Sequence, residues 1–181
     1  MIWVFVVAFV LALILKARLT GFANQNLHDF AGQSPVFDPK RDLDGPMLCE
    51  GVIYGPMGRV AARFVARMEG RWQGNTGVLT EHFKYDTGVE QNREWRLTID
   101  KDGLLRTEAD DLVGAGSGQA AGSALRLLYR LRLPATAGGH VVDVTDWLYL
   151  MENGTIINRS RFRKWGVPVG ELVATIRRVA A

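Results

Sequence analysis

Residues 60–72 of the chain are Val-Ala-Ala-Arg-Phe-Val-Ala-Arg-Met-Glu-Gly-Arg-Trp. An apolar side chain occupies nearly every second position, with Phe64, Ala66 and Met68 among them, and arginine or glutamate occupies most positions between. Successive side chains of a β-strand point to opposite faces of a sheet, so this alternation predicts a strand with one buried and one solvated face.

The same period of two recurs along the rest of the chain, and turn residues such as Gln73-Gly74-Asn75 and Asp86-Thr87-Gly88 separate the segments. Residues 169–179 fit a strand or a helix, and we favour a strand because antiparallel neighbours need a closing partner. The faces predicted to point inward are Leu79, Glu81, Phe83 and Tyr85; Arg93, Trp95, Leu97 and Ile99; Leu125, Leu127, Tyr129, Leu131 and Leu133; Val142, Val144, Asp146, Leu148 and Leu150; and Ile156, Asn158, Ser160 and Phe162.

This pattern predicts an all-β fold of roughly eight to ten antiparallel strands, which must close or stack to hide their edges. We expect a closed or partly closed, lipocalin-like barrel, with a β-sandwich as the alternative. A barrel of this size has room for one small ligand.

The N-terminus differs from the rest, because Met1 to Leu15 contain no polar side chain and Lys16 and Arg18 follow. Fifteen helical residues reach only about 22 Å, which is shorter than the hydrocarbon core of a bilayer. Snorkelling of the flanking basic side chains would extend the span. A signal peptide starts with basic residues and ends at a small-residue cleavage site, both missing here, so we favour an uncleaved anchor. The predicted organisation is a transmembrane anchor at 1–19, a linker at 20–45 and a β-barrel at 46–181.

The predicted location is the bacterial inner membrane, with a single span. Lys16 and Arg18 on the C-terminal side of the anchor favour a cytoplasmic barrel.

Composition narrows the classes of function. Apolar residues make up 48% and charged residues 23% of the chain, which suits a packed core. The net charge of +3 gives no reason to expect nucleic acid as a partner. The lone Cys49 cannot form an internal disulfide, and the scattered His28, His82 and His140 do not have the spacing of metal ligands. The sequence therefore predicts no metal site and no cofactor.

Four polar side chains, Glu81, Arg93, Asp146 and Asn158, fall on faces predicted to be inward. A buried charge must be paired or meet a ligand. Because Glu81 and Arg93 flank one turn, a hairpin would set them opposite each other, as a structural ion pair or as a site for a ligand head group. With Tyr129 and Trp95 these four form the candidate ligand site. No residue is assigned as catalytic, although Glu81 with Asp146 is the carboxyl pair to consider for acid/base chemistry.

Basic residues recur on three predicted outward faces. A solvated sheet face balanced by acids such as Glu90, Glu94, Glu108, Asp110 and Asp111 is one interpretation, and contact with anionic lipid head groups is the other. The basic positions are Arg59, Arg63, Arg67 and Arg71; Arg126, Arg130 and Arg132; and Arg159, Arg161 and Arg163.

Seven short motifs follow one another along the chain. They are Glu81–Gly88, Arg93–Trp95, Ala109–Gly114, Tyr129–Pro134, Asp146–Leu150, Asn158–Ser160 and Lys164–Glu171. In this order they resemble a bacterial family of uncharacterised proteins, the domain of unknown function numbered thirty-eight thirty-three. The resemblance spans about Phe30 to the C-terminus, and the family implies no established activity. Many relatives look like lipoproteins, which implies a periplasmic barrel by analogy. The chain departs from the family at Ser123, where an asparagine is typical, and at Thr145, where an aspartate is typical.

Three functions fit these features. The first is a membrane-tethered barrel that binds a lipid, a fatty-acyl chain or another hydrophobic small molecule. It predicts a cavity lined by residues such as Phe64, Phe83, Trp95, Tyr129 and Phe162. The second is an interaction or scaffold protein of the envelope, with a filled core and an exposed aromatic or arginine patch. The third is an enzyme acting on a lipid-like substrate through Glu81, Asp146 or Tyr129.

Overall fold

The computed structural model describes residues 25–179, together with Trp3, Phe5 and Phe9. The predicted anchor at 1–19 falls almost wholly outside these residues and stays a prediction, as does the inner-membrane location. In the part of the chain that the structure describes, no helix is both long and apolar enough to cross a membrane.

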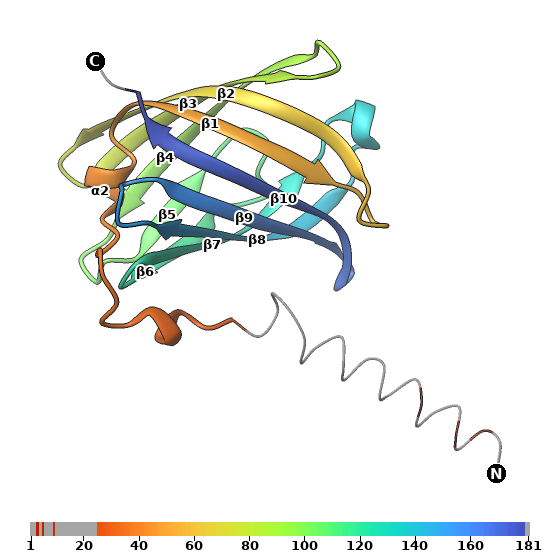
Figure 1. Cartoon of the computed structure of the whole chain (residues 1–181), viewed down its shortest axis with the longest axis horizontal. Helices are drawn as coiled ribbons and strands as arrows, with labels where there is room; N and C mark the ends of the chain where they lie inside the picture. The colour runs from red at the N-terminus through yellow and green to blue at the C-terminus, as the bar shows by residue number, and fades with distance from the viewer. Residues whose placement is uncertain (1–2, 4, 6–8, 10–24, 180–181) are drawn as a thin grey trace.

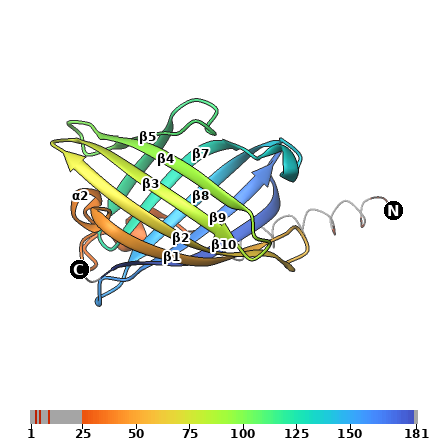
Figure 2. The same cartoon turned by 90° about the horizontal axis from the view of Figure 1, so that it is seen from above.

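Within residues 25–179, ten strands form one closed antiparallel barrel, so the all-β closed-barrel prediction is confirmed (Figures 1 and 2). Around the barrel the order is β1-β10-β9-β8-β7-β6-β5-β4-β3-β2. The ambiguous C-terminal segment is a strand, β10, and it closes the sheet against β1. The strands are β1 (Gly45–Tyr54), β2 (Val60–Gln73), β3 (Thr76–Tyr85), β4 (Glu90–Ile99), β5 (Leu105–Glu108), β6 (Gly116–Ala121), β7 (Ala124–Arg132), β8 (Val141–Leu150), β9 (Ile156–Lys164) and β10 (Val167–Arg178).

Two short helices lie in the segment before β1, and η3 (Ala135–Ala137) lies between β7 and β8. The first two are η2 (Leu27–Phe30), capped by Asn26, and α2 (Pro39–Asp42), capped by Asp38. The side-chain oxygens of both caps accept hydrogen bonds from backbone amides of the first turn, which leaves fewer unsatisfied groups at these helix starts.

The segment before β1 closes one end of the barrel. Phe37 and Leu43 are 3% and 4% exposed and belong to the main core. The Trp72 indole donates to the Leu43 carbonyl at 3.3 Å, and the Phe37 amide donates to the Gly122 carbonyl at 2.8 Å. Residues predicted to form a linker therefore plug the barrel.

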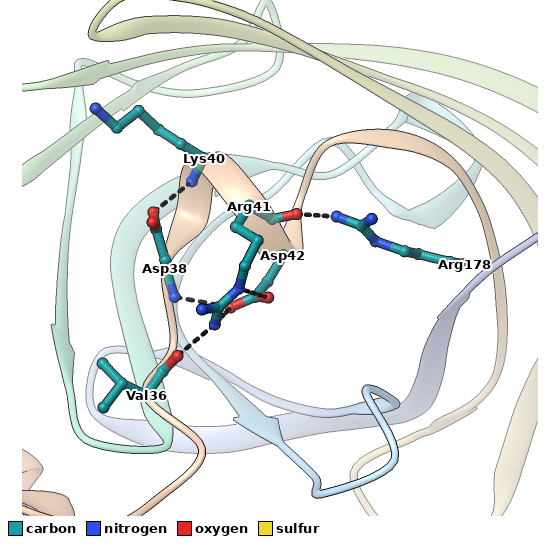
Figure 3. Close-up of polar contacts among 6 residues, drawn as sticks. All are labelled: Val36, Asp38, Lys40, Arg41, Asp42 and Arg178. Carbon is teal, nitrogen blue, oxygen red and sulfur yellow. Dashed lines mark hydrogen bonds and ion pairs between the residues drawn. The ribbon is translucent and has the colours of Figure 1, made fainter.

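Polar contacts hold α2 in this position (Figure 3). The Arg41 guanidinium donates to the Asp42 carboxylate at 2.8 and 2.9 Å and to the Val36 carbonyl at 2.5 Å. The Arg178 side chain, near the end of β10, donates to the Arg41 carbonyl. The plug and the last strand are thus tied to each other.

The same segment also covers part of the outer wall. Trp147 lies on the outward face of β8, yet it is 1% exposed because Leu27 and Phe30 pack over it. Here Gly122 has a positive φ of 49°, and a Cβ on it would lie 1.7 Å from the Phe30 carbonyl oxygen. Only glycine fits this approach.

The opposite end of the barrel has no such plug in the described residues. Both views place α2 and the end of β10 at one end, and the turns after β1, β3 and β7 at the other. Many inward side chains near these turns are only partly buried, although Val142 and Val144 of β8 are 2% exposed, and we call this end the barrel mouth. The partly buried side chains are Ile53, Phe83, Tyr85, Leu131, Leu133, Phe162, Val169 and Leu172.

We predict that the plug is required for stability. Phe37→Ala removes a buried aromatic ring and should lower the free energy of unfolding by about 3–5 kcal/mol. Val36→Ala is the matched control, because Val36 is 60% exposed, and it should change stability by less than about 0.5 kcal/mol. Urea unfolding followed by tryptophan fluorescence measures both. Equal effects of the two variants would show that Phe37 does not plug the barrel.

Candidate functional site

A layer of polar side chains crosses the barrel interior. Glu81 on β3 stands opposite Arg93 on β4, as the turn between them predicts. One rung nearer the mouth are Phe83 and Gln91, and one rung deeper is Trp95, paired with Leu79. The charged pair therefore lies between an accessible rim and a buried floor.

Arg93 is held by three neighbours. Its guanidinium carbon lies 3.9 Å from the centroid of the Trp95 ring, which is cation–π distance. Its Nε donates to the Asp111 carboxylate at 3.1 Å, and Nη2 lies 3.0 Å from the same carboxylate. Nη2 is buried and has no hydrogen-bond partner of good geometry in the described residues. The side chain as a whole is 14% exposed, so Nη2 is a buried donor that is ion-paired with Asp111 but makes no well-aligned hydrogen bond.

Glu81 is not ion-paired to Arg93, although the two share a rung. Its Oε2 accepts a hydrogen bond from the Trp95 indole at 3.2 Å. Burial raises the pKa of Glu81 to about 7, against the opposing effects of Arg93 and the Trp95 bond. Asp146 and Asp111 add to the rise. At neutral pH this carboxyl is poised between its charged and neutral forms.

Asp146 lies on β8, on another part of the wall, and accepts hydrogen bonds from three side chains. Asn158 Nδ2 and Ser160 Oγ, both on β9, donate to Oδ1, the latter at 2.7 Å. The Tyr129 hydroxyl donates to Oδ2 at 3.4 Å. Burial raises the pKa of Asp146, while these donors pull it down. Asn158 also donates to the Trp147 carbonyl at 3.1 Å, so the amide orients the carboxyl.

Tyr129 joins the two groups. Its ring packs edge-on against Trp95, with centroids 5.2 Å apart, and the Arg93 guanidinium lies 5.9 Å from its ring centroid. Burial raises the Tyr129 pKa well above its ordinary value, so the hydroxyl stays protonated and donates. One continuous network thus runs from β3 to β9 through this ring.

The fold brings the six residues proposed from the sequence into this one layer. Two members were missed as site residues. Asp111 was assigned to an outward acidic set, but it lies in the irregular segment after β5 and turns in to Arg93. Ser160 was expected to point inward without a role, and its position opposite Asp146 shows the role. The alternation along β9 could have revealed Ser160. Asp111 lies outside the regular strands, where no alternation of side chains indicates which way a residue points.

The middle of the barrel is filled by its own side chains. Phe64, Trp95 and Tyr129 are buried in the main core, and Phe64 packs against Phe83 with ring centroids 5.3 Å apart. The large cavity expected between these residues is therefore wrong. One open hollow lies across β1, β2, β9 and β10, and another lies across β1 to β4 and is lined in part by Glu81 and Arg93. Inside the barrel, partly buried apolar side chains lie at the mouth, and Trp72 and Ile99 are partly buried near the plug.

Cys49 points into the same interior but is a poor nucleophile. Burial, with a smaller contribution from Glu81, raises its pKa to about 12. The thiol is therefore protonated at neutral pH.

The match to a family model covers residues 16–178, and the model is described as "Protein of unknown function (DUF3833)". The chain belongs to this family. The resemblance found in the motifs is thereby confirmed, and it extends beyond Phe30 toward the N-terminus.

Two solved structures are similar in architecture. One is a redesigned β-barrel, mFAP0, bound to DFHBI, with 12% identity, a TM-score of 0.43, and coverage of 76% of this chain and 100% of that chain. The other is a putative exported protein with a YmcC-like fold from Bacteroides fragilis, with 10% identity, a TM-score of 0.36, and coverage of 81% and 99%. No curated protein matches the chain. At these similarities neither structure indicates what this member of the family binds.

The raised pKa of Glu81 predicts a pH dependence of stability. The folded state keeps this proton up to about pH 7, whereas the unfolded state loses it near the ordinary value of 4.5. The contribution of Glu81 to stability is therefore complete below pH 4.5 and falls as the pH rises to about 7.

Glu81→Gln should remove this loss, so the variant should gain stability relative to the wild type between these pH values. The gain should be a few kcal/mol at most, since one pKa unit corresponds to about 1.4 kcal/mol. Urea unfolding over the pH series measures the difference. Glu94→Gln is the control, because Glu94 is exposed on the outer face of β4. Its free energy of unfolding should change with pH as that of the wild type does.

Proposed function

We propose that this barrel binds an amphipathic small molecule, such as a lipid or a fatty-acyl compound, at its mouth. The apolar part of the ligand would contact the partly buried rim, which includes Phe83, Leu131 and Phe162. Its polar end would reach the layer of Glu81 and Arg93. The observation that carries the proposal is the buried polar layer directly beneath an accessible apolar rim.

Energetics support a functional role for this layer. Burying ionisable groups is costly, and hydrophobic replacements of such groups often leave a protein equally or more stable. A purely structural core has no need for three carboxyls, Glu81, Asp111 and Asp146, around the single cation Arg93. On the inner face of β3, Glu81 is next to the partly buried rim residue Phe83, which suits contact with a ligand.

The charged side chains of the polar layer also restrict which polar group the ligand can carry. Three carboxyls surround one guanidinium, and Arg93 already pairs with Asp111. A second anion would find the charge of Arg93 already balanced by Asp111, whereas a hydroxyl or amide can donate to Glu81 and accept from Arg93 Nη2, which makes no other hydrogen bond. We therefore propose an uncharged polar end, and we expect a long-chain alcohol or monoacylglycerol to bind better than a fatty-acid anion.

The scaffold function remains a second candidate, and the filled middle of the barrel favours it. The enzyme alternative would use Glu81, whose pKa of about 7 suits proton transfer. Its second carboxyl, Asp146, is already occupied as the acceptor of three side-chain hydrogen bonds. The arrangement of the layer thus favours binding over acid/base chemistry.

Native mass spectrometry of the full chain, released from detergent, tests the proposal directly. We expect one co-purifying amphipathic molecule per chain, or stoichiometric uptake of an added monoacylglycerol, with weaker uptake of the matching fatty acid. A chain that arrives empty and takes up neither compound would contradict ligand binding and favour the scaffold.

A variant pair locates the site. Arg93→Lys keeps the charge but loses the planar stack on Trp95 and the fixed fork of donors. It should weaken uptake about tenfold or more, since a hydrogen bond to a charged group contributes roughly 1.5–3 kcal/mol. Arg96→Lys, three residues along the same strand and half-exposed on the outer face, should bind as the wild type does. Equal binding by both variants would remove Arg93 from the site.

A further inference from the structure

The β9–β10 hairpin carries a residue that folding does not explain. Lys164 pairs with Val167, so Trp165 and Gly166 form a two-residue turn, with φ angles of 52° and 79°. Turns of this kind favour asparagine or glycine at the first position, because a bulky side chain with positive φ is strained. Trp165 is nevertheless there and is 90% exposed. Strain kept at a solvent-exposed aromatic residue points to a function.

A second hairpin carries apolar side chains at the same end of the barrel. β1 pairs with β10, and Tyr54 stands opposite Glu171, so the β1–β2 and β9–β10 turns project from the mouth side by side. Met57 at the first tip is 83% exposed, and Val60 and Val167 beside the tips are 55% and 62% exposed. Apolar tips thus project from two neighbouring hairpins.

Positive charge surrounds these tips. The stretches 51–68 and 153–170 contain no acidic residue, and their acidic neighbours in ion pairs are Asp86 with Arg63 and Glu171 with Arg159. Lys164 lies beside the Trp165 ring, with Nζ 4.8 Å from its centroid. Burial and the like charges of Arg163 and Arg159 lower the pKa of Arg161, against the effect of Glu171. The basic residues of the two stretches are Arg59, Arg63, Arg67, Arg159, Arg161, Arg163 and Lys164.

We propose that the two hairpin tips, Met57 and Trp165, dock the barrel mouth onto the surface of an anionic lipid bilayer. Tryptophan prefers the boundary between head groups and acyl chains, and basic residues just behind it meet lipid phosphates. Separate apolar prongs backed by positive charge suit a fluid, negatively charged surface better than a rigid protein partner. The inference rests on this surface alone and does not require the ligand proposed above.

The test uses the full chain reconstituted in lipid nanodiscs, with an environment-sensitive fluorophore on a single introduced cysteine. Cys49 is buried and protonated, so it should not react. Met57→Cys places the probe at the mouth, and Glu152→Cys places it in the β8–β9 turn at the opposite end. Lipids carrying a nitroxide quencher report contact with the bilayer.

With phosphatidylglycerol in the disc, the probe at 57 should be strongly quenched and the probe at 152 should not. Discs of phosphatidylcholine alone should give little quenching at either position. Equal quenching at 57 and 152, or equal quenching in the two lipids, would overturn the proposal. A fatty-acyl ligand that binds without this quenching difference would leave the proposed function standing and the docking surface refuted.

A matched pair of double variants separates docking from simple tethering near the membrane. Trp165→Ala with Lys164→Gln should reduce docking roughly tenfold, because one interfacial anchor and one near-surface charge are lost. Leu104→Ala with Lys101→Gln removes an exposed apolar and a basic residue from the β4–β5 turn, at the other end. That pair should leave quenching at 57 unchanged. Equal quenching at 57 in both double variants would refute docking through Trp165.

Discussion

The pairing of β1 with β10 is the constraint on which the rest of the structure depends. Eight residue pairs join the first and last strands and close the sheet, so the barrel leaves no unpaired edge. Closure also divides each strand into an inward and an outward face. Every inward polar residue must then find a partner inside a small volume, because water and an open edge are no longer available to it. The network of Glu81, Arg93 and Asp146 follows from this requirement.

The plug decides which end of that volume is accessible. Phe37 and Leu43 complete the core at one end, while η2 continues over the outer wall and covers Trp147. A segment of irregular backbone normally lies on the surface of a protein. Here it is stabilised by the backbone hydrogen bond from Phe37 to Gly122, by the bond from the Trp72 indole to the Leu43 carbonyl and by the close approach of Phe30 to Gly122. The plug therefore leaves the opposite end of the barrel as the open one.

The barrel mouth combines two kinds of chemistry at different depths. Just inside it, carboxyls outnumber cations around Arg93, which favours an uncharged polar group. Outside it, the neighbouring hairpins carry basic residues around Met57 and Trp165, which favours a negatively charged surface. The two regions can differ in the sign of their charge because successive residues of a strand lie on opposite faces of the sheet.

The alternation of side chains in the sequence determined the strands and the inward position of Glu81, Arg93, Asp146 and Asn158, since a period of two sets the face of every residue in a strand. It left a closed barrel and a sandwich both open, and the pairing of β1 with β10 decided between them. It also predicted that Glu81 and Arg93 share a rung, because a short turn fixes the register of a hairpin. Only the tertiary structure decided that Asp111, not Glu81, pairs with Arg93, because residues outside regular strands follow no period. The filling of the interior by Phe64, Trp95 and Tyr129, and its closure by Phe37, were likewise decided by packing between segments far apart in the chain, which no local pattern encodes.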